Sequence, residues 1–225
     1  MKHFKTISEF DQAEGFPPPE HPLFSLNLLE RPTQIEPDLE FSCDFYIISM
    51  KKLKSGDMVY GKTKYDHNTG LMFFAKPNQM ILCRSVQYAE KGFVVHLHED
   101  FLTGHPLFSE IKKYTFFDYE TNESLFLSPR EKEVMWSLYH KMEKEYHDNP
   151  DEFSKQIILS HLDSMLKYAQ RFYKRQFIDR KPITGKTVTK FNECLNVYFE
   201  KGEAEGKGLP TVNNMASQLN LSPKY

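Results

Sequence analysis

Short runs of apolar and β-branched residues, separated by turn residues, make up the chain between positions 23 and 120. Residues 23–29 alternate apolar and polar side chains, whereas residues 43–50 are apolar almost throughout. Both patterns are strand signals. The pattern predicts further strands at residues 58–60, 71–75, 80–82 and 92–98. It predicts turns at residues 55–57 and 66–70. Several short strands divided by turns predict a small antiparallel β sandwich or barrel.

A helical period replaces this pattern after residue 127. Ser128-Pro-Arg-Glu131 is a capping box with proline at the first helical position. The helix that it opens carries apolar residues along one face, namely Val134, Leu138, Met142 and Tyr146. A second helix is expected from a cap at residues 149–152 to about residue 177. The predicted fold class is therefore α+β, with the β domain first and the helices after it.

The second helix carries an apolar stripe whose members lie three and four residues apart: Ile158, Leu162, Met165, Ala169 and Phe172. Lys and Arg residues flank the stripe, as they do in helices that pair along an apolar seam. One interpretation is a dimerisation surface that meets its copy in a second subunit. The other, which is the commoner fate of such a stripe, packs it against the chain's own sheet.

Residues 209–225 have the pattern of a helix-turn-helix. Thr211 can cap a short helix whose apolar face holds Val212, Met215, Ala216 and Leu219. Asn220 tolerates the left-handed conformation of a sharp helix exit, and Ser222-Pro223 supplies the N-cap and first position of a second helix. In a helix-turn-helix that second helix lies in the major groove of DNA.

The run Leu-Pro-Thr-Val-x-x-Met-Ala-x-x-Leu-x-Leu-Ser-Pro-x-Tyr at residues 209–225 resembles the first helix-turn-helix of AraC-type bacterial transcription regulators. Two upstream segments, Gly70-Leu-Met-Phe-Phe-Ala-x-Pro-x-Gln and Gly92-Phe-Val-Val-x-Leu-His-x-Asp-Phe-Leu, look like strands of the cupin-type sensor domain of such regulators. The resemblance covers nearly the whole chain. It departs from the family pattern of two helix-turn-helix units, because this chain stops early in the recognition helix of the first, so we expect a truncated DNA-binding domain.

The resemblance implies a cupin-like sensing domain over residues 1–127, a helical dimerisation segment over 128–177, a linker over 178–186 and an incomplete helix-turn-helix domain over 187–225. It implies a homodimeric regulator that responds to an unknown small-molecule effector and binds operator DNA. Operator binding by this chain is expected to be weak or absent, because the base-reading residues would lie beyond Tyr225. Thr211 and Ser222 are expected to orient the helices, and Lys224 to meet a phosphate.

Composition and charge narrow the setting. The 225 residues include three widely separated cysteines, an odd number that fits reduced thiols in a cytoplasmic protein better than a disulfide framework. No run of about 18 apolar residues exists to span a bilayer, so no membrane partner is expected. The net charge is −2, but residues 151–225 hold 12 Lys and Arg against 8 Asp and Glu, or +4, which leaves −6 for the rest. This basic excess either attracts phosphate nonspecifically or is a solvated helix face.

Candidate chemistry in the β domain is limited to small-molecule binding. The side chains expected to line a cavity are Tyr46, Ile48, Tyr60, Phe73, Phe93 and His96. Each of them could instead belong to the core, because alternation along a strand identifies two faces and does not say which face encloses a cavity.

Histidines raise the question of a metal site. His96 and His98 lie two apart on a predicted strand, which is the beginning of such a site, but no neighbouring strand supplies a histidine to complete it. His3 and His21 fall in an N-terminal stretch that looks disordered. We therefore expect no metal, no cofactor, no catalytic residue and no enzymatic activity. A cupin-like metal-dependent enzyme, and a dimerisation module without a ligand, are the alternatives that stay open.

Overall fold

The computed structural model describes residues 2–29, 39–51, 53–60, 63–64, 72–88, 91–117, 125–148, 151–178 and 208–219, together with positions 191, 194, 195 and 198. For residues 53–60, 63–64, 84–88 and 177–178 it describes the backbone alone. The chain divides into two compact units, Met1–Gln176 and Phe177–Tyr225, which are described separately.

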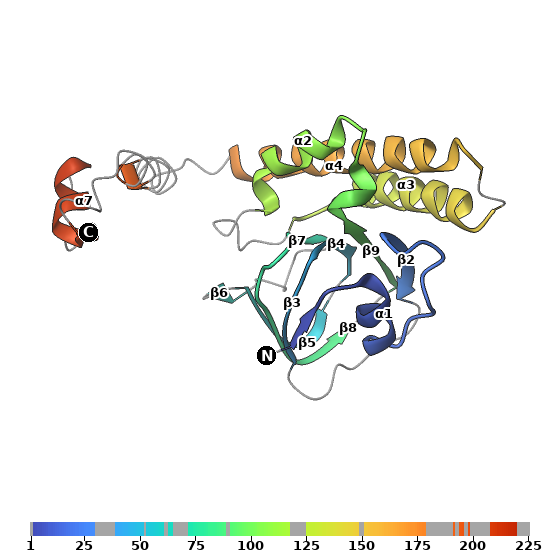
Figure 1. The fold of residues 1–225 in the computed structure, drawn as a ribbon, viewed down its shortest axis with the longest axis horizontal. Helices are drawn as coiled ribbons and strands as arrows, with labels where there is room; N and C mark the ends of the chain where they lie inside the picture. The colour runs from blue at the N-terminus through green and yellow to red at the C-terminus, as the bar shows by residue number, and fades with distance from the viewer. Residues whose placement is uncertain are drawn as a thin grey trace. The chain divides into compact units, whose positions relative to one another are not determined.

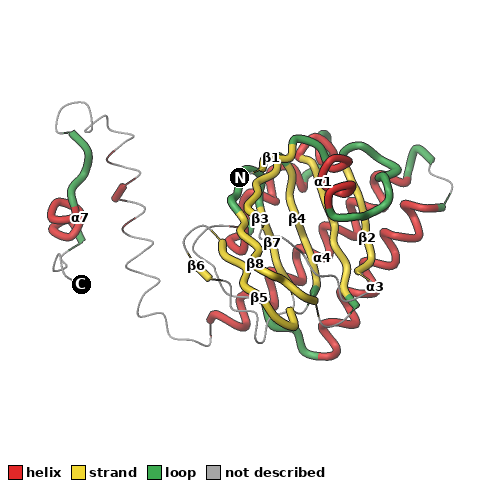
Figure 2. Tube along the Cα trace, turned by 90° about the horizontal axis from the view of Figure 1, so that it is seen from below, coloured by secondary structure: helices red, strands yellow, loops and turns green. Residues whose placement is uncertain are grey.

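The first unit is a mixed α+β structure that contains two β-sheets (Figures 1 and 2). One sheet has five strands in the order β1 (Lys2–Phe4), β3 (Leu39–Cys43), β8 (Ile81–Tyr88), β5 (Leu53–Tyr60) and β6 (Thr63–Lys64). The other has four strands in the order β2 (Phe24–Leu29), β9 (Gly92–His98), β4 (Phe45–Met50) and β7 (Met72–Ala75). Neighbouring strands are antiparallel except for the parallel pair β1–β3. Within the described ranges no strand pairing joins the two sheets into one closed barrel, so the α+β fold class is confirmed and the barrel is not.

Helices cover one face of the four-stranded sheet, as Figure 1 shows. They are α3 (Pro129–His147) and α4 (Ser154–Ile178). The connection from β9 to α3 contains the short helix α2 (Leu107–Glu110) and three 3-10 turns, Glu99–Leu102, Ile111–Lys113 and Thr115–Phe117. The four-stranded sheet therefore lies between a helical layer and the second sheet.

Alternation along the middle strands sends their side chains into two different cores. In β4, Tyr46 and Ile48 are buried in a cluster with residues of α3 and α4, which we call the helix-facing core. Phe45 and Ile47, one position away, are buried in a cluster with residues of the five-stranded sheet, which we call the inter-sheet core. Successive strand residues point to opposite faces, so a sheet covered on both sides needs apolar residues at both sets of positions. This is why residues 43–50 read as a continuous apolar run.

The predicted capping box of α3 is confirmed, and one residue of the predicted 149–152 cap, Asp151, contacts the start of α4. The Glu131 amide donates to Ser128 Oγ at 3.4 Å, and the Ser128 amide donates to Glu131 Oε2 at 2.8 Å, which is the predicted capping box of α3. At the start of α4 the Ser154 amide donates to Asp151 Oδ1 at 3.1 Å, and the Asp151 amide donates to Ser154 Oγ at 3.0 Å. Helix α4 thus begins two residues after the predicted cap and ends within a residue of the expected position.

The apolar stripe of α4 packs within its own chain. Its five members, Ile158, Leu162, Met165, Ala169 and Phe172, are between 0% and 6% exposed and belong to the helix-facing core. The interpretation of this stripe as a dimerisation surface is corrected, because α3 and the four-stranded sheet already cover it. A homodimer remains a prediction, and it would have to use other residues.

The N-terminal stretch that looked disordered is ordered. It forms strand β1, which pairs with β3, and helix α1 (Ile7–Ala13), capped by Thr6, whose Oγ1 accepts from the Glu9 amide at 3.2 Å. Phe4, Ile7 and Phe10 are buried against the inter-sheet core. A short, polar-looking segment is ordered here because three of its side chains reach a core that the rest of the chain builds.

Residues 55–57 were predicted to be a turn, and the structure places them inside strand β5. The pairing of β5 with β8 shifts register between Leu53 and Ser55 and again between Ser55 and Asp57. Glycine inside a strand often marks a bulge, and Gly56 lies at this irregularity. The predicted turn at 66–70 lies outside the described residues.

The second unit is described at helix α7 (Val212–Gln218) and a few positions before it. Thr211 caps α7 as predicted, since its Oγ1 accepts from the Asn214 amide at 3.2 Å. Met215 and Ala216 are buried, whereas Val212 is 71% exposed. Before the helix, the Tyr198 hydroxyl donates to the Gly208 carbonyl at 2.9 Å. Ser222 and Lys224 lie outside the described residues. In the described part of the whole chain, no helix is long and apolar enough to cross a bilayer.

The packing of α4 predicts the effect of truncating its stripe. Leu162 is fully buried, so Leu162→Ala should lower the free energy of unfolding by about 2–5 kcal/mol. Ile157→Ala, on the exposed side of the same helix, should cost about 1 kcal/mol or less. Urea denaturation at several protein concentrations measures both effects. The opposite result would be a urea midpoint that rises with protein concentration in the parent and no longer does so in Leu162→Ala. That result would show that the stripe is a subunit interface.

Candidate functional site

A pocket lies between the two sheets and beside α1. Its empty space is about 470 Å³ with the open mouth included, and the centres of water molecules can occupy about 40 Å³ of it. The four-stranded sheet, the five-stranded sheet and the N-terminal segment all contribute side chains to its wall: Phe10, Glu14, Phe16, Leu29, Phe41, Ile47, Lys51, Phe73, Ile81, Cys83, Val94 and His96. A mostly apolar wall with a few polar groups is typical of a small-molecule site.

Strand register brings several polar side chains to the inter-sheet face. His96 in β9 lies opposite Ser25 in β2 and Ile47 in β4, while Asn27 and Ser49 lie on either side of Val94 in the next row. His96, Ser25, Asn27 and Ser49 are all buried. The inter-sheet face therefore carries buried polar side chains on β2, β4 and β9 among its apolar ones.

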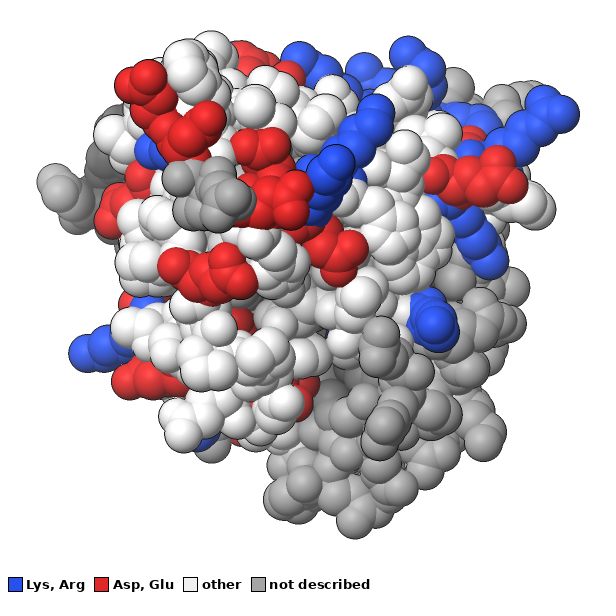
Figure 3. Space-filling view, turned by 90° about the vertical axis from the view of Figure 1, so that its right-hand side faces the viewer, with Lys and Arg blue, Asp and Glu red and all other residues white. Residues whose placement is uncertain are grey.

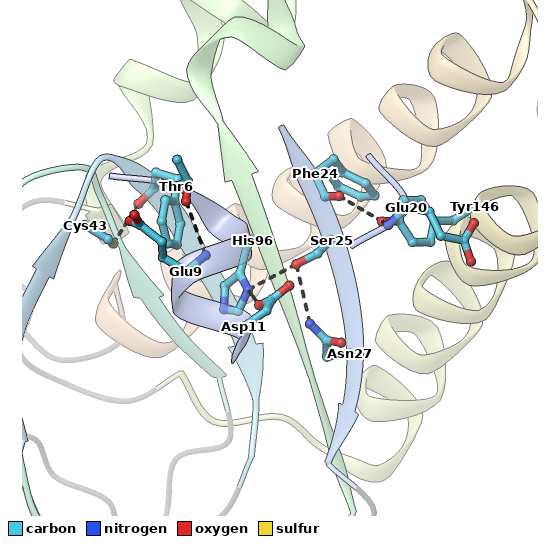
Figure 4. Close-up of polar contacts among 11 residues, drawn as sticks. Thr6, Glu9, Asp11, Glu20, Phe24, Ser25, Asn27, Cys43, His96 and Tyr146 are labelled. Atoms are coloured by element: carbon cyan, nitrogen blue, oxygen red, sulfur yellow. Dashed lines mark hydrogen bonds and ion pairs between the residues drawn. The ribbon is translucent and has the colours of Figure 1, made fainter. Parts of the chain in front are cut away.

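A buried histidine–aspartate pair anchors α1 to the four-stranded sheet (Figure 4). Asp11 Oδ1 lies 2.7 Å from His96 Nδ1, and the two side chains are 0% and 1% exposed. Ser25 Oγ is 3.2 Å from the same nitrogen and accepts from Asn27 Nδ2 at 3.4 Å. A carboxylate offers only lone pairs, so this contact requires the proton on Nδ1, and a ring that carries a single proton then offers a lone pair at Nε2.

Two phenylalanine rings, from α1 and from β4, pack against the His96 imidazole. Phe10 of α1 contacts the His96 ring edge-on, with centroids 5.0 Å apart and planes at 90°. Phe45 of β4 does the same at 5.6 Å and 61°. The ring orientation is thus determined by packing as well as by the bond to Asp11, which is what a preorganised recognition group requires.

Glu14 and Lys51 add opposite charges to the pocket wall. Burial raises the pKa of the Glu14 carboxyl above its ordinary value of 4.5, Lys51 and His96 oppose that rise, and Asp11 reinforces it. Lys51 Nζ also lies 5.8 Å from the centroid of the Phe73 ring. Both side chains are partly exposed, so solvent moderates their interaction.

Cysteine contributes bulk and no reactive group at this site. Burial raises the pKa of the Cys83 thiol to about 11 and that of the Cys43 thiol to about 12. A thiol with such a pKa is protonated at neutral pH, whereas nucleophilic catalysis requires the thiolate. Cys83 therefore serves as a small apolar part of the wall.

The residues proposed from the sequence as cavity lining fall on both faces of the sheet. Phe73 and His96 line the pocket. Tyr46, Ile48 and Phe93 instead belong to the helix-facing core, so their assignment to a cavity is corrected. The Tyr60 side chain lies outside the described residues. The sequence could not separate cavity lining from core because both faces of these strands are buried. The packing of the helices shows which face belongs to the helix-facing core.

Sequence reasoning missed the contribution of α1. Phe10, Asp11 and Glu14 reach the pocket or its anchor from a segment that was set aside as disordered. A signal was present, because Thr6-Ile-Ser-Glu9 has the pattern of a capping box and announces a helix start. The contact between Asp11 and His96, 85 positions apart, carries no sequence signal of its own.

The histidine pair considered for a metal does not assemble a ligand set. His98 Nδ1 accepts from the Asp100 amide at 3.2 Å at the end of β9, and His96 is held by Asp11. Among the described residues, no group of three or more His, Cys, Asp or Glu side chains is arranged to hold a metal ion.

A second cleft lies where α3 ends and α4 begins, on a face where acidic side chains gather (Figure 3). Glu20, Asp151 and Lys155 are among its lining residues. Two of these acids already have roles, because Glu20 Oε1 contacts His147 Nδ1 at 2.6 Å and Asp151 caps α4. Burial, with Lys155 nearby, lowers the pKa of His21 in the same cleft. The inter-sheet pocket is the stronger candidate site, because its polar groups are more deeply buried.

The raised pKa of Glu14 predicts a pH-dependent stability effect. A charged Glu14 is disfavoured in the folded state, so its cost is fully present above the raised pKa and disappears as pH falls below 4.5, where the carboxyl is protonated in both states. Glu14→Gln should therefore raise stability at pH 7 by up to about 1 kcal/mol, or about 2–4 °C in Tm. Thermal unfolding at pH 7 and at about pH 4 checks this, with Glu9→Gln on the exposed side of α1 as the control. A variant no more stable than the parent at pH 7 would contradict it.

No family model and no curated protein matches the chain.

Proposed function

We propose that this chain belongs to a ligand-responsive transcription regulator of the AraC type, in which the first unit senses a small molecule and the second is part of a helix-turn-helix DNA-binding domain. The observation that carries the sensing role is the inter-sheet pocket, where an aromatic wall meets Glu14, Lys51 and an oriented His96. The capped helix α7 supports the DNA-binding role, since it matches the first helix of the expected motif. A cupin-like relationship of the two-sheet unit is part of the same proposal.

The proposed mechanism couples the pocket to the helices through the four-stranded sheet. Ile47 lines the pocket, while its neighbour Ile48 is buried in the helix-facing core with α3 and α4. Helix α4 ends at Ile178, and the second unit begins at Phe177. A ligand that prefers one arrangement of sheet and helices shifts the population toward it, and in a homodimer this changes how two DNA-binding units are presented.

Ligand-dependent stabilisation tests the sensing role. The 225-residue protein is melted against sugars, alcohols, amines, carboxylic acids and metal ions. A ligand at a hundred times its dissociation constant should stabilise the native state by about 2.7 kcal/mol, which raises Tm by several degrees. Phe16→Ala in the pocket wall should weaken the effect, whereas Phe153→Ala, a 58% exposed phenylalanine far from the wall in sequence, should leave it unchanged.

Two results would contradict the proposal. Stabilisation by a stoichiometric metal alone would favour the enzyme alternative, and silence across the panel would favour a module without a ligand. DNA binding is tested separately by a gel shift on promoter DNA at low salt, where sequence-selective, nanomolar binding by this chain would contradict the expectation that its operator binding is weak or absent.

A further inference from the structure

We propose that the ligand of the inter-sheet pocket is a small primary amine, bound as its ammonium between the Glu14 carboxylate and His96 Nε2. This inference rests on the proposed sensing function and adds to it the chemical class of the effector. It names Glu14 and His96 as the residues that determine specificity.

Two polar groups at the pocket, His96 Nε2 and the Glu14 carboxylate, can accept hydrogen bonds, whereas the partly exposed Lys51 is a donor. His96 Nδ1 is engaged by Asp11 at 2.7 Å, and no described residue hydrogen-bonds to Nε2, so the lone pair on Nε2 is the group left for a ligand. Glu14 lines the same pocket and, as a carboxylate, also offers only lone pairs. A ligand that complements both must bring N–H or O–H donors.

The buried charge behind this wall is negative. Asp11 is fully buried, and its Oδ2 is sealed from solvent with no hydrogen-bond partner in the described structure. Lys51 is the one Lys or Arg among the described lining residues, and it is partly exposed, so water screens its charge more than that of Asp11. Asp11 and Glu14 bring two carboxylates to this part of the structure against the one ammonium of Lys51, so the pocket favours a cation over an anion.

The effect of burial on Glu14 points in the same direction. Its carboxylate is disfavoured because it has lost solvation, and a ligand cation placed beside it restores part of what was lost. An anionic ligand would deepen the same penalty. Binding of an ammonium and ionisation of Glu14 therefore support each other.

The apolar wall suits both the cation and its hydrocarbon part. Phenylalanine side chains line the pocket at four positions, Phe10, Phe16, Phe41 and Phe73. Aromatic faces attract ammonium groups, and the rings also bury aliphatic carbon. A donor-rich polyol, by contrast, would bring more polar groups than the few acceptors of this wall can satisfy.

The size of the pocket limits the ligand. About 40 Å³ of space for water centres corresponds to about three water molecules. A molecule of about five non-hydrogen atoms fills that space. Primary alkylamines have pKa values near the 10.4 of Lys, so such a ligand is an ammonium at neutral pH.

Three matched compounds test the inference on the whole 225-residue protein: isobutylamine, isobutanol and isobutyrate. They share one branched carbon skeleton and differ in the polar group, which is respectively a cation, a neutral donor and an anion. We expect isobutylamine to bind at least about tenfold more tightly than isobutanol, and isobutyrate not to bind, in calorimetric titrations at pH 7.

Glu14→Gln and Glu9→Gln make the same chemical change at a pocket position and at an exposed position of α1. Glu14→Gln should weaken isobutylamine binding by about tenfold or more, while Glu9→Gln should leave it within about twofold of the parent. The expected rise in stability of Glu14→Gln separates lost binding from lost folding.

Equal binding of the amine and the alcohol, preference for isobutyrate, or silence from isobutylamine would each overturn the inference. Any of these results leaves the sensing role to be decided by the broader panel, where a different ligand class could still stabilise the protein. Silence across that panel as well would overturn both proposals.

Discussion

The contact between Asp11 and His96 is the constraint on which the pocket depends. It ties the N-terminal helix α1 to the centre of the four-stranded sheet across 85 positions of sequence. A buried carboxylate is costly unless it is paired and hydrogen-bonded, so the pairing at 2.7 Å is what allows Asp11 to be fully buried. Phe10 and Phe45 then hold the imidazole by edge-on contacts. This hydrogen bond is the polar contact that holds α1 against the sheet, where Phe10 and the adjacent Glu14 form part of the pocket wall.

The four-stranded sheet has two buried faces with different roles. One face meets α3 and α4 in an apolar, aromatic core, in which Phe93 stacks on Tyr139 with centroids 4.5 Å apart. The other face meets the second sheet and holds the buried polar side chains and the pocket. Because neighbouring residues of the same strand belong to opposite faces, one strand contacts both the pocket and the helical layer. That arrangement suits a sensor that must pass a small binding event to helices beyond the sheet.

Much of the fold could be predicted from local signals. The capping box at Ser128 and Glu131, the 3.6-residue period of α3 and α4 and the strand of residues 92–98 are all present as expected. Predictions failed where a local signal has two physical solutions. Gly56 marks a register shift in β5 instead of a turn, and the stripe centred on Leu162 meets its own sheet instead of a second subunit. The short segment containing α1 was passed over, because seven helical residues gain their stability from tertiary packing.

For the site, the sequence by itself determined that the strands have two faces and that His96 and Phe73 were candidates for a cavity wall. Only the tertiary structure decided which face encloses the pocket, and it moved Tyr46, Ile48 and Phe93 to the opposite side. It also brought in Asp11 and Glu14 from a helix with no periodic signal long enough to read. The physical reason is that periodicity reports burial, which is a local property, whereas a binding site is defined by which distant surfaces meet. That meeting follows from the packing of α1, the two sheets and the helices together.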